Sequence, residues 1–384
     1  MNGHSSNRSR VFAVSVAHLF NDWYMNYIQT LLPFLLVAGL SISKGAYLIA
    51  AFTVTSSLVQ PLFGILADRR NHRWMVYVGT LWAALFLSLV GVLESYILLF
   101  LAVSLAGLGN AAFHPQASAM INNAAGERKG FFQAIFMAAG NVGWALTPLL
   151  VVPFVQTYGL ERTPLLALPG VLVALMMLWF ANPRQTAAVT KPVAAAPPLW
   201  PIITKVWREL AKIMLVISCR SLSFFGLVAF LPLYLLHRDV EHLAGSRLLF
   251  LMLFSGALGG LIGGYLSDIF GRKIVIAGSL IMACPLFNLF LLSSGPLSYV
   301  FLSLSGCCLL ASFSVTVVAT QDILSDNAAM AAGLMLGFGM GIGGLGVGVV
   351  GWLAEQRGVE LVVHWLVFLP LLAGLFAMTM RKVN

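Results

Sequence analysis

The chain contains a series of apolar runs, each long enough to cross a membrane and separated from the next by a short polar stretch. A helix needs about 20 residues to cross a hydrocarbon core of about 30 Å, and runs of this length recur along the whole sequence. About twelve membrane-spanning helices are therefore expected. The predicted spans cover residues 11–39, 45–67, 74–93, 97–121, 131–155, 164–182, 210–236, 247–267, 273–293, 297–320, 329–353 and 361–380.

Composition indicates that lipid surrounds most of the chain. Hydrophobic residues make up 60% of it and charged residues 9%, whereas about a quarter of the residues in a soluble globular protein are charged. A membrane β-barrel is disfavoured, because its strands alternate in polarity over about 10 residues and these runs do not. The sequence predicts an all-α membrane protein.

The basic residues are distributed unevenly between the two sides of the predicted topology. On the side of the termini lie Arg8, Arg10, Arg69, Arg70, Arg73, Arg128, Lys129, Arg184, Lys191, Lys205, Arg208, Lys212, Arg272, Lys273, Arg381 and Lys382. The opposite loops hold Lys44, Arg162, Arg238, Arg247 and Arg357. Basic residues accumulate in cytoplasmic loops, so both termini are predicted to be cytoplasmic. The net charge of +9 is then mostly a topology signal and forms no basic face for nucleic acid.

A polar, proline-rich stretch divides the spans into two groups of six. It is too poor in large apolar residues to fold on its own and is expected to be a semi-extended linker. The predicted parts are a cytoplasmic tail at 1–10, a six-helix half at 11–182, a linker at 183–208, a second six-helix half at 209–380 and a cytoplasmic tail at 381–384.

The two halves repeat one another in sequence. Residues 64–73 read GILADRRNHR and residues 264–273 read GYLSDIFGRK, at an offset of 264 − 64 = 200. Gly140 matches Gly343 at an offset of 343 − 140 = 203. A nearly constant offset indicates a parallel repeat about an axis along the membrane normal.

Both decapeptides resemble the signature loop of the major facilitator superfamily, Gly-x-Leu-Ala/Ser-Asp-x-x-Gly-Arg-Arg/Lys. The second copy matches fully, whereas the first has Asn71 in place of the glycine and His72 in place of a basic residue. The resemblance implies two six-helix bundles whose loop carboxylates cap helices of the opposite half and latch the cytoplasmic side. The alternative is a plain basic turn. The gating residues implied are Asp68, Arg69, Arg73, Asp268, Arg272, Lys273 and Gly333.

Further motifs are similar to the fosmidomycin-resistance branch of drug exporters. They are HLFND at 18–22, GLGNAAFHP at 107–115, GNVG at 140–143 and a glycine-rich run in the span predicted at 329–353. One departure is Gln116, where the branch commonly has a glutamate. The resemblance implies export by alternating access and an anionic or amphiphilic substrate, such as a phosphonate.

Ionisable residues inside predicted spans are costly in lipid and are therefore functional candidates. His18 and Asp22 are four residues apart, hence on one helical face, and Asn26 and Gln29 extend this polar stripe. The stripe is expected to face a cavity that binds substrate, with Asp22 coupling transport to protons and His18 assisting. The alternative is that Asp22 permanently neutralises a nearby cation, since burial and pairing act oppositely on a carboxyl group.

Arg220 lies near the start of the span predicted at 210–236. The planar fork of a guanidinium holds carboxylates and phosphates through two hydrogen bonds. Arg220 is therefore expected to pair with Asp22 or to bind an anionic group of the substrate. The alternative is an arginine that extends its charged end to the membrane interface.

His114 precedes Pro115 in the middle of the span predicted at 97–121. Proline removes a backbone hydrogen bond and bends the helix, which frees carbonyl groups to line a cavity. His114 is expected to contact substrate or relay protons, or else to bond a neighbouring helix. Because His18 lies on a different predicted helix, no carboxylate–histidine cluster and no metal site are expected. The other candidates for substrate binding are Gln116, Gln133 and Asn141.

These features predict a secondary active exporter that moves a small drug or an anionic or amphiphilic metabolite outward in exchange for protons. No nucleotide-binding motif and no converging catalytic groups are present, so neither a cofactor nor an enzyme activity is expected. The alternative on the same fold is a proton-coupled uptake symporter for a small organic anion. The expected partners are the substrate, protons and the lipid bilayer, and the chain is expected to act as a monomer in the bacterial inner membrane.

Overall fold

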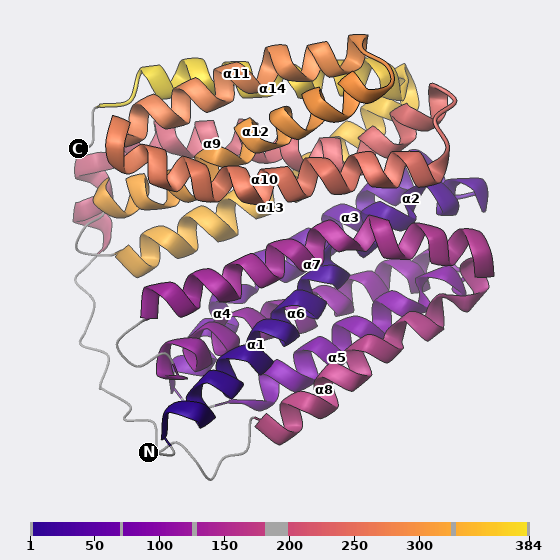
Figure 1. Cartoon of the computed structure of the whole chain (residues 1–384), viewed down its shortest axis with the longest axis horizontal. Coiled ribbons are helices and arrows are strands. Elements are labelled where there is room, and N and C mark those ends of the chain that lie inside the picture. The colour runs from indigo at the N-terminus through magenta and orange to yellow at the C-terminus, as the bar shows by residue number, and fades with distance from the viewer. Residues whose placement is uncertain (1–2, 70–71, 125–128, 181–198, 324–327, 382–384) are drawn as a thin grey trace. The chain divides into compact units, whose positions relative to one another are not determined.

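The computed structural model describes residues 3–69, 72–124, 129–180, 199–323 and 328–381 (Figure 1). Every regular element in these ranges is a helix, and the chain forms two compact units, Met1–Lys191 and Pro192–Asn384. Unit 1 holds α1 (Gly3–Met25), α2 (Tyr27–Val37), α3 (Ile42–Ser57), α4 (Gln60–Arg69), α5 (Trp74–Ser88), α6 (Tyr96–Ala124), α7 (Lys129–Tyr158) and α8 (Leu168–Phe180), with 3₁₀ turns at Leu89–Gly91 and Leu160–Ala167. Unit 2 holds α9 (Leu199–His237), α10 (His242–Phe270), α11 (Arg272–Leu292), α12 (Pro296–Ile323), α13 (Ala328–Arg357) and α14 (Val359–Met378).

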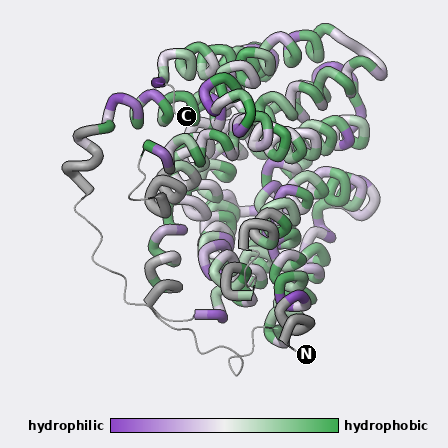
Figure 2. The backbone as a smooth tube through the Cα atoms, turned by 60° about the vertical axis from the view of Figure 1, so that its left-hand side comes forward, coloured by the Kyte–Doolittle hydropathy of each residue, from purple (hydrophilic) through white to green (hydrophobic). Residues whose placement is uncertain are grey.

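The helices are long and apolar, as a multi-pass membrane protein requires. Eleven helical segments of the described residues are long and apolar enough to cross a membrane. Most of the backbone in Figure 2 is green, the colour of hydrophobic residues, and purple marks short stretches. Large apolar side chains are exposed on the helices, Trp179 at 82% and Leu292 at 86% among them, where a soluble protein avoids large apolar patches. The predicted all-α membrane fold is confirmed.

The first predicted span is the one for which no membrane-crossing segment is found among the described residues. Residues 11–39 form two helices, because α1 ends at Met25 and α2 begins at Tyr27. Neither meets the standard for a membrane span on its own, since α1 carries the polar residues of the predicted stripe and α2 has only 11 residues. The span that is least apolar is therefore the one that carries most of the candidate chemistry.

Two boundaries differ from the sequence prediction. Helix α9 begins at Leu199, so the last part of the linker predicted at 183–208 is helical rather than extended. Helix α1 begins at Gly3, so most of the tail predicted at 1–10 is helical as well. In both places helical hydrogen bonding continues beyond the apolar segment, which the hydrophobic pattern alone does not reveal.

Hydrogen bonds to backbone carbonyls fix α1 within unit 1. The hydroxyl of Thr147 on α7 donates to the carbonyl of Trp23 at 2.7 Å, and the amide of Asn26 donates to the carbonyl of Trp144 at 3.2 Å. The hydroxyl of Tyr24 donates to the carbonyl of Leu166 at 2.7 Å. Polar side chains at lipid depth commonly bond across helices in this way, and these bonds hold the end of α1 against α7 and against the 3₁₀ turn at Leu160–Ala167.

Helices α5 and α6 pack closely where two glycines meet. A Cβ atom built on Gly79 would lie 2.6 Å from the carbonyl oxygen of Gly109. We predict that Gly79→Ala destabilises the protein by about 1–3 kcal/mol, as overpacking does, and lowers its unfolding temperature in detergent. The matched control is Gly278→Ala on α11, where a Cβ would have no atom within 4 Å. Equal unfolding temperatures for the two variants would contradict this packing.

Candidate functional site

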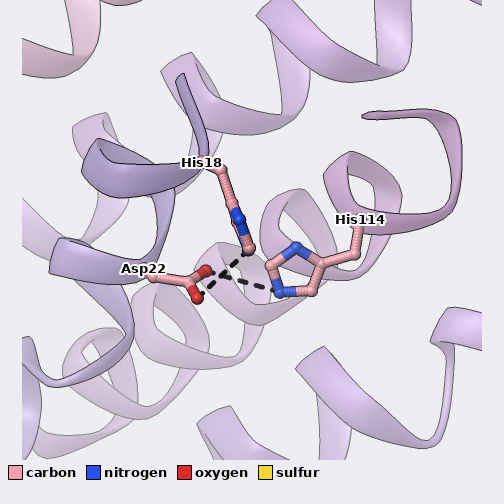
Figure 3. Close-up of side chains that lie close together, drawn as sticks. All are labelled: His18, Asp22 and His114. Atoms are coloured by element: carbon pink, nitrogen blue, oxygen red, sulfur yellow. Dashed lines mark ion pairs between the residues drawn. The ribbon is translucent and has the colours of Figure 1, made fainter. Parts of the chain in front are cut away.

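Three ionisable side chains lie together inside unit 1 (Figure 3). His18 and Asp22 project from successive turns of α1, and His114 projects toward them from α6. Nε2 of His18 lies 3.2 Å from Oδ2 of Asp22, and Nε2 of His114 lies 3.5 Å from Oδ1. Each carboxylate oxygen therefore faces a different imidazole, and we refer to these residues as the His–Asp–His cluster.

The imidazole of His18 is fixed by α7. Its Nδ1 lies 2.6 Å from the carbonyl oxygen of Phe136, and its ring stacks on the Phe136 ring with the centroids 3.9 Å apart. A carbonyl only accepts hydrogen bonds, so Nδ1 must carry the hydrogen of this bond. The other nitrogen, Nε2, is the one that faces Asp22. The hydrogen bond thus sets both the tautomer and the orientation of the ring.

A proton is needed between His18 and Asp22. With Nδ1 protonated, a neutral imidazole presents a lone pair at Nε2, and an ionised carboxylate also presents only lone pairs. Two acceptors 3.2 Å apart do not form a hydrogen bond. The contact is bonding when a proton lies on Nε2 or on Oδ2, so this geometry is one in which the pair holds a proton.

The surroundings of Asp22 contain few other polar groups. The amide of Asn21 donates to Oδ1 at 3.4 Å, and the charged or titratable groups of unit 1 that act on the carboxylate are the two imidazoles, within the part of the chain described. The side chain of Asp22 is 13% exposed. Among the described residues of its own unit, Asp22 is therefore partnered by two imidazoles and not by a lysine or an arginine.

Gly140 allows α7 to approach the cluster. A Cβ atom built on Gly140 would lie 2.5 Å from Oδ2 of Asp22 and 2.5 Å from Cε1 of His18. No side chain larger than hydrogen fits at this position without moving one of the two residues. The first glycine of the GNVG motif, Gly140, thus leaves the space that the side chains of His18 and Asp22 occupy.

The cluster corrects one expectation from the sequence. No carboxylate–histidine cluster was expected, because His18 and His114 lie on different helices. The packing of α1 against α6 brings one donor atom from each of the three residues within 4.8 Å of the others. Such a set meets the distance requirement for a metal ion. The pairing of one imidazole with each carboxylate oxygen is equally the arrangement of a proton-sharing network.

The remaining polar candidates of unit 1 fall into two groups. Asn26, Gln29 and Gln116 are buried. Asn141 on α7 is exposed, and the side chain of Gln133 lies outside the described residues. Asn26 lies between α1 and α2, Gln29 on α2 and Gln116 on α6, whereas the exposed Asn141 does not join these buried residues.

Asn110 on α6 belongs to the same polar face and was not singled out by the sequence analysis. It is 1% exposed, and neither atom of its amide has a hydrogen-bond partner among the described residues. Nδ1 of His114, one turn further along α6, is also buried without such a partner. Buried polar groups are normally satisfied, so these atoms are ready to bind water or a ligand. Their spacing of four residues was the available signal.

In unit 2, Arg220 is buried rather than extended to an interface. The residue is 4% exposed, which contradicts the interpretation of an interfacial arginine. Nη1 donates to the hydroxyl of Thr316 at 3.3 Å and Nη2 to the hydroxyl of Ser221 at 3.5 Å. The guanidinium also lies over the ring of Phe313, 4.8 Å from its centroid. Pairing with Asp22 would join the two units and stays a prediction.

The predicted gating residues are only partly described. Arg272 at the start of α11 pairs with Asp322 at the end of α12, so it has a partner within its own unit. Asp268 is exposed at the end of α10. Arg73 precedes α5, and Lys273 is half-buried on α11. The side chains of Asp68 and Arg69 lie outside the described residues, and Gly333 lies on α13. A latch between the halves stays a prediction.

Known proteins resemble this chain over nearly its whole length. Residues 14–335 match the model of the Major Facilitator Superfamily. The fosmidomycin resistance protein of Escherichia coli strain K12 is 29% identical over 94% of this chain and 90% of its own length. The uncharacterized MFS-type transporter YfnC of Bacillus subtilis strain 168 is 30% identical over the same shares. A bacterial homolog of the human lysosomal transporter Spinster, solved in an inward-facing, unoccupied conformation, matches with a TM-score of 0.81 at 16% identity, covering 97% of this chain and 96% of that one.

We predict that Gly140→Ala separates His18 from Asp22. The added methyl group must displace one of them, and overpacking of about 1–3 kcal/mol is comparable to one hydrogen bond to a charged group, about 1.5–3 kcal/mol. The measurement is the ¹⁵N NMR spectrum of histidine-labelled protein in nanodiscs, with the His18 signals assigned from His18→Gln. The ring signals of His18 should shift. Gly260→Ala on α10, with 3.7 Å of clearance, is the control, and unchanged His18 signals in Gly140→Ala would refute the prediction.

Proposed function

The chain belongs to the Major Facilitator Superfamily, and we propose that it exports a small drug or an anionic or amphiphilic metabolite in exchange for protons. It is a multi-pass membrane transporter, and its bacterial relatives indicate that it lies in the bacterial inner membrane. In this proposal it acts as a monomer with both termini in the cytoplasm, as the distribution of basic residues predicts. Access to the cluster from the two sides of the membrane alternates as the halves move.

The single observation that carries proton coupling is the contact between His18 and Asp22. The carbonyl oxygen of Phe136 accepts the hydrogen bond from Nδ1 of His18. The other ring nitrogen, Nε2, can therefore form a hydrogen bond with the carboxylate of Asp22 only when a proton lies between them. The second imidazole, His114, reaches the other oxygen of Asp22. A proton can then be loaded on the cluster from one side and released to the other.

Two further observations support a small-molecule substrate. Asn110 and His114 present buried polar atoms without partners among the described residues, which a substrate can satisfy. The Escherichia coli relative is named for resistance to fosmidomycin, which supports export as the direction. Asn26, Gln29, Gln116 and the candidate cation Arg220 complete the proposed binding residues.

We predict that Asp22→Asn abolishes transport driven by a pH gradient, because an amide neither binds nor releases a proton at neutral pH. The assay is uptake of labelled fosmidomycin into inverted vesicles with an acidic lumen, and the initial rate should fall to that of vesicles without the protein. Asp239→Asn is the matched control, since Asp239 is exposed with a left-handed backbone (φ 58°) that asparagine tolerates. Unchanged pH-driven transport in Asp22→Asn would rule out Asp22 as the coupling group.

The direction of transport is tested separately in intact cells. Cells that express the wild-type chain should accumulate less of the compound than cells that express Asp22→Asn, because export removes it against its gradient. An uncoupler that collapses the proton gradient should abolish the difference. Higher accumulation in wild-type cells would instead support the alternative function, proton-coupled uptake of an organic anion.

A further inference from the structure

Arg220 differs from three other cationic residues of unit 2, which form ion pairs. Arg238 pairs with Glu360, Arg272 with Asp322 and Lys212 with Glu209. Arg220 is the most deeply buried of these four, at 4% exposure, yet no carboxylate among the described residues of unit 2 lies within ion-pair distance of it. The most buried of the four side chains, Arg220, therefore lacks the carboxylate partner that the three more exposed side chains have.

The contacts that Arg220 does make are with neutral groups. Two hydroxyls accept from Nη1 and Nη2, at 3.3 Å for Thr316 and 3.5 Å for Ser221. A guanidinium has five N–H groups, so three of them, five minus two, have no acceptor among the described residues of unit 2. Removing an unpaired charge from water costs several kcal/mol even after relaxation. This cost is offset when an anion binds.

The hydroxyl groups differ in what they offer a ligand. Thr316 donates its own proton to the carbonyl of Phe313 at 2.8 Å, so its oxygen only accepts from Arg220 and positions the guanidinium. Ser221 accepts from Arg220, and its proton has no acceptor among the described residues of unit 2. Ser221 can therefore donate to the same anion as the guanidinium.

The ring of Phe313 restricts where an anion can lie. It covers one face of the guanidinium, 4.8 Å from ring centroid to Cζ, so a ligand approaches the edge, where the N–H groups point. Two parallel N–H groups at an edge match the paired oxygens of a carboxylate, a phosphonate or a phosphate. A single spherical anion uses only part of this fork.

We propose that Arg220 and Ser221 form an oxyanion-binding site, positioned by Thr316 and Phe313, that takes the acid group of the transported compound. The proposal rests on the proposed function only in that the ligand is the substrate, and it deepens that function by assigning substrate recognition to unit 2. The substrate class is a carboxylate, phosphonate or phosphate attached to an apolar body, which the aromatic ring can contact. Neutral compounds of the same shape leave the guanidinium unpaired and are rejected.

Equilibrium binding to the purified full-length protein in nanodiscs tests the site without transport. The probes are phenylphosphonate and benzoate, compared by calorimetry with the neutral dimethyl phenylphosphonate and methyl benzoate. Both acids should bind wild type at least about tenfold more tightly than their esters, the lower end expected for one charge-assisted hydrogen bond. Equal affinity of acids and esters, or no binding of either acid, would overturn the proposal.

Variants assign the effect to Arg220. Arg220→Gln should weaken acid binding by about 10- to 100-fold and leave ester binding unchanged. Arg220→Lys should keep the preference for acids at reduced affinity, because it retains the charge without the fork, and it decides the question if the glutamine variant does not fold. Arg238→Gln is the matched control, an exposed arginine that directly follows α9, and should bind like wild type. Unchanged acid affinity in both Arg220 variants would refute the site.

A second set of variants separates substrate recognition from an ion pair with Asp22. If Arg220 binds the acid, Asp22→Asn should keep or strengthen acid binding, since it removes a competing carboxylate. If Arg220 serves only as a counter-ion, the unfolding temperature lost in Arg220→Gln should be restored in Asp22→Asn/Arg220→Gln, and neither variant should change acid affinity, which would overturn the proposal. Loss of pH-driven transport with intact, Arg220-dependent acid binding would count against proton coupling and leave the oxyanion site standing.

Discussion

The hydrogen bond from His18 to the carbonyl of Phe136 determines what the polar face of α1 can do. It is 2.6 Å long and joins α1 to α7, so the imidazole cannot turn its other nitrogen away from Asp22. The carbonyl accepts the only hydrogen that a neutral ring would carry, and the second nitrogen and the carboxylate then need a proton between them. A structural contact between two helices is thereby converted into a requirement for a titratable proton, and His114 and Gly140 are arranged around the same carboxylate.

The two halves use one scaffold for opposite charges. In unit 1, α1 packs against α7, and the absence of a side chain at Gly140 leaves room for His18 and Asp22. In unit 2, α9 packs against α13, and the absence of a side chain at Gly343 leaves room for Phe225 and Ser221. These glycines correspond in the sequence repeat. Near these matching glycines, the first half has the carboxylate of Asp22 with two imidazoles, and the second half has Ser221, the residue next to Arg220. The two halves therefore share the close packing of helices at a glycine, whereas their ionisable groups differ.

Much of this was predictable from the sequence, because lipid imposes strong rules. Apolar runs gave eleven of the spans directly, and the spacing of His18 and Asp22 placed them on one face of a helix. The position of His114 relative to them was not predictable. It depends on how α6 is rotated and shifted against α1, and spacing along one helix carries no information on its neighbour. The burial of Arg220 was ambiguous for a similar reason, since the sequence does not show which neighbouring helices cover its side chain.

The signs of the two charges also bear on direction. Exchange of one outgoing monoanion for one incoming proton moves two positive charges inward per cycle. An inside-negative potential of 100 mV contributes about 2.3 kcal/mol for each charge, hence about 4.6 kcal/mol in favour of export. Uptake of the same monoanion with one proton moves no net charge and gains nothing from the potential. If the chain binds an anionic substrate and a proton as proposed, the membrane potential therefore favours export over uptake, and the rate of export should depend on membrane potential as well as on pH.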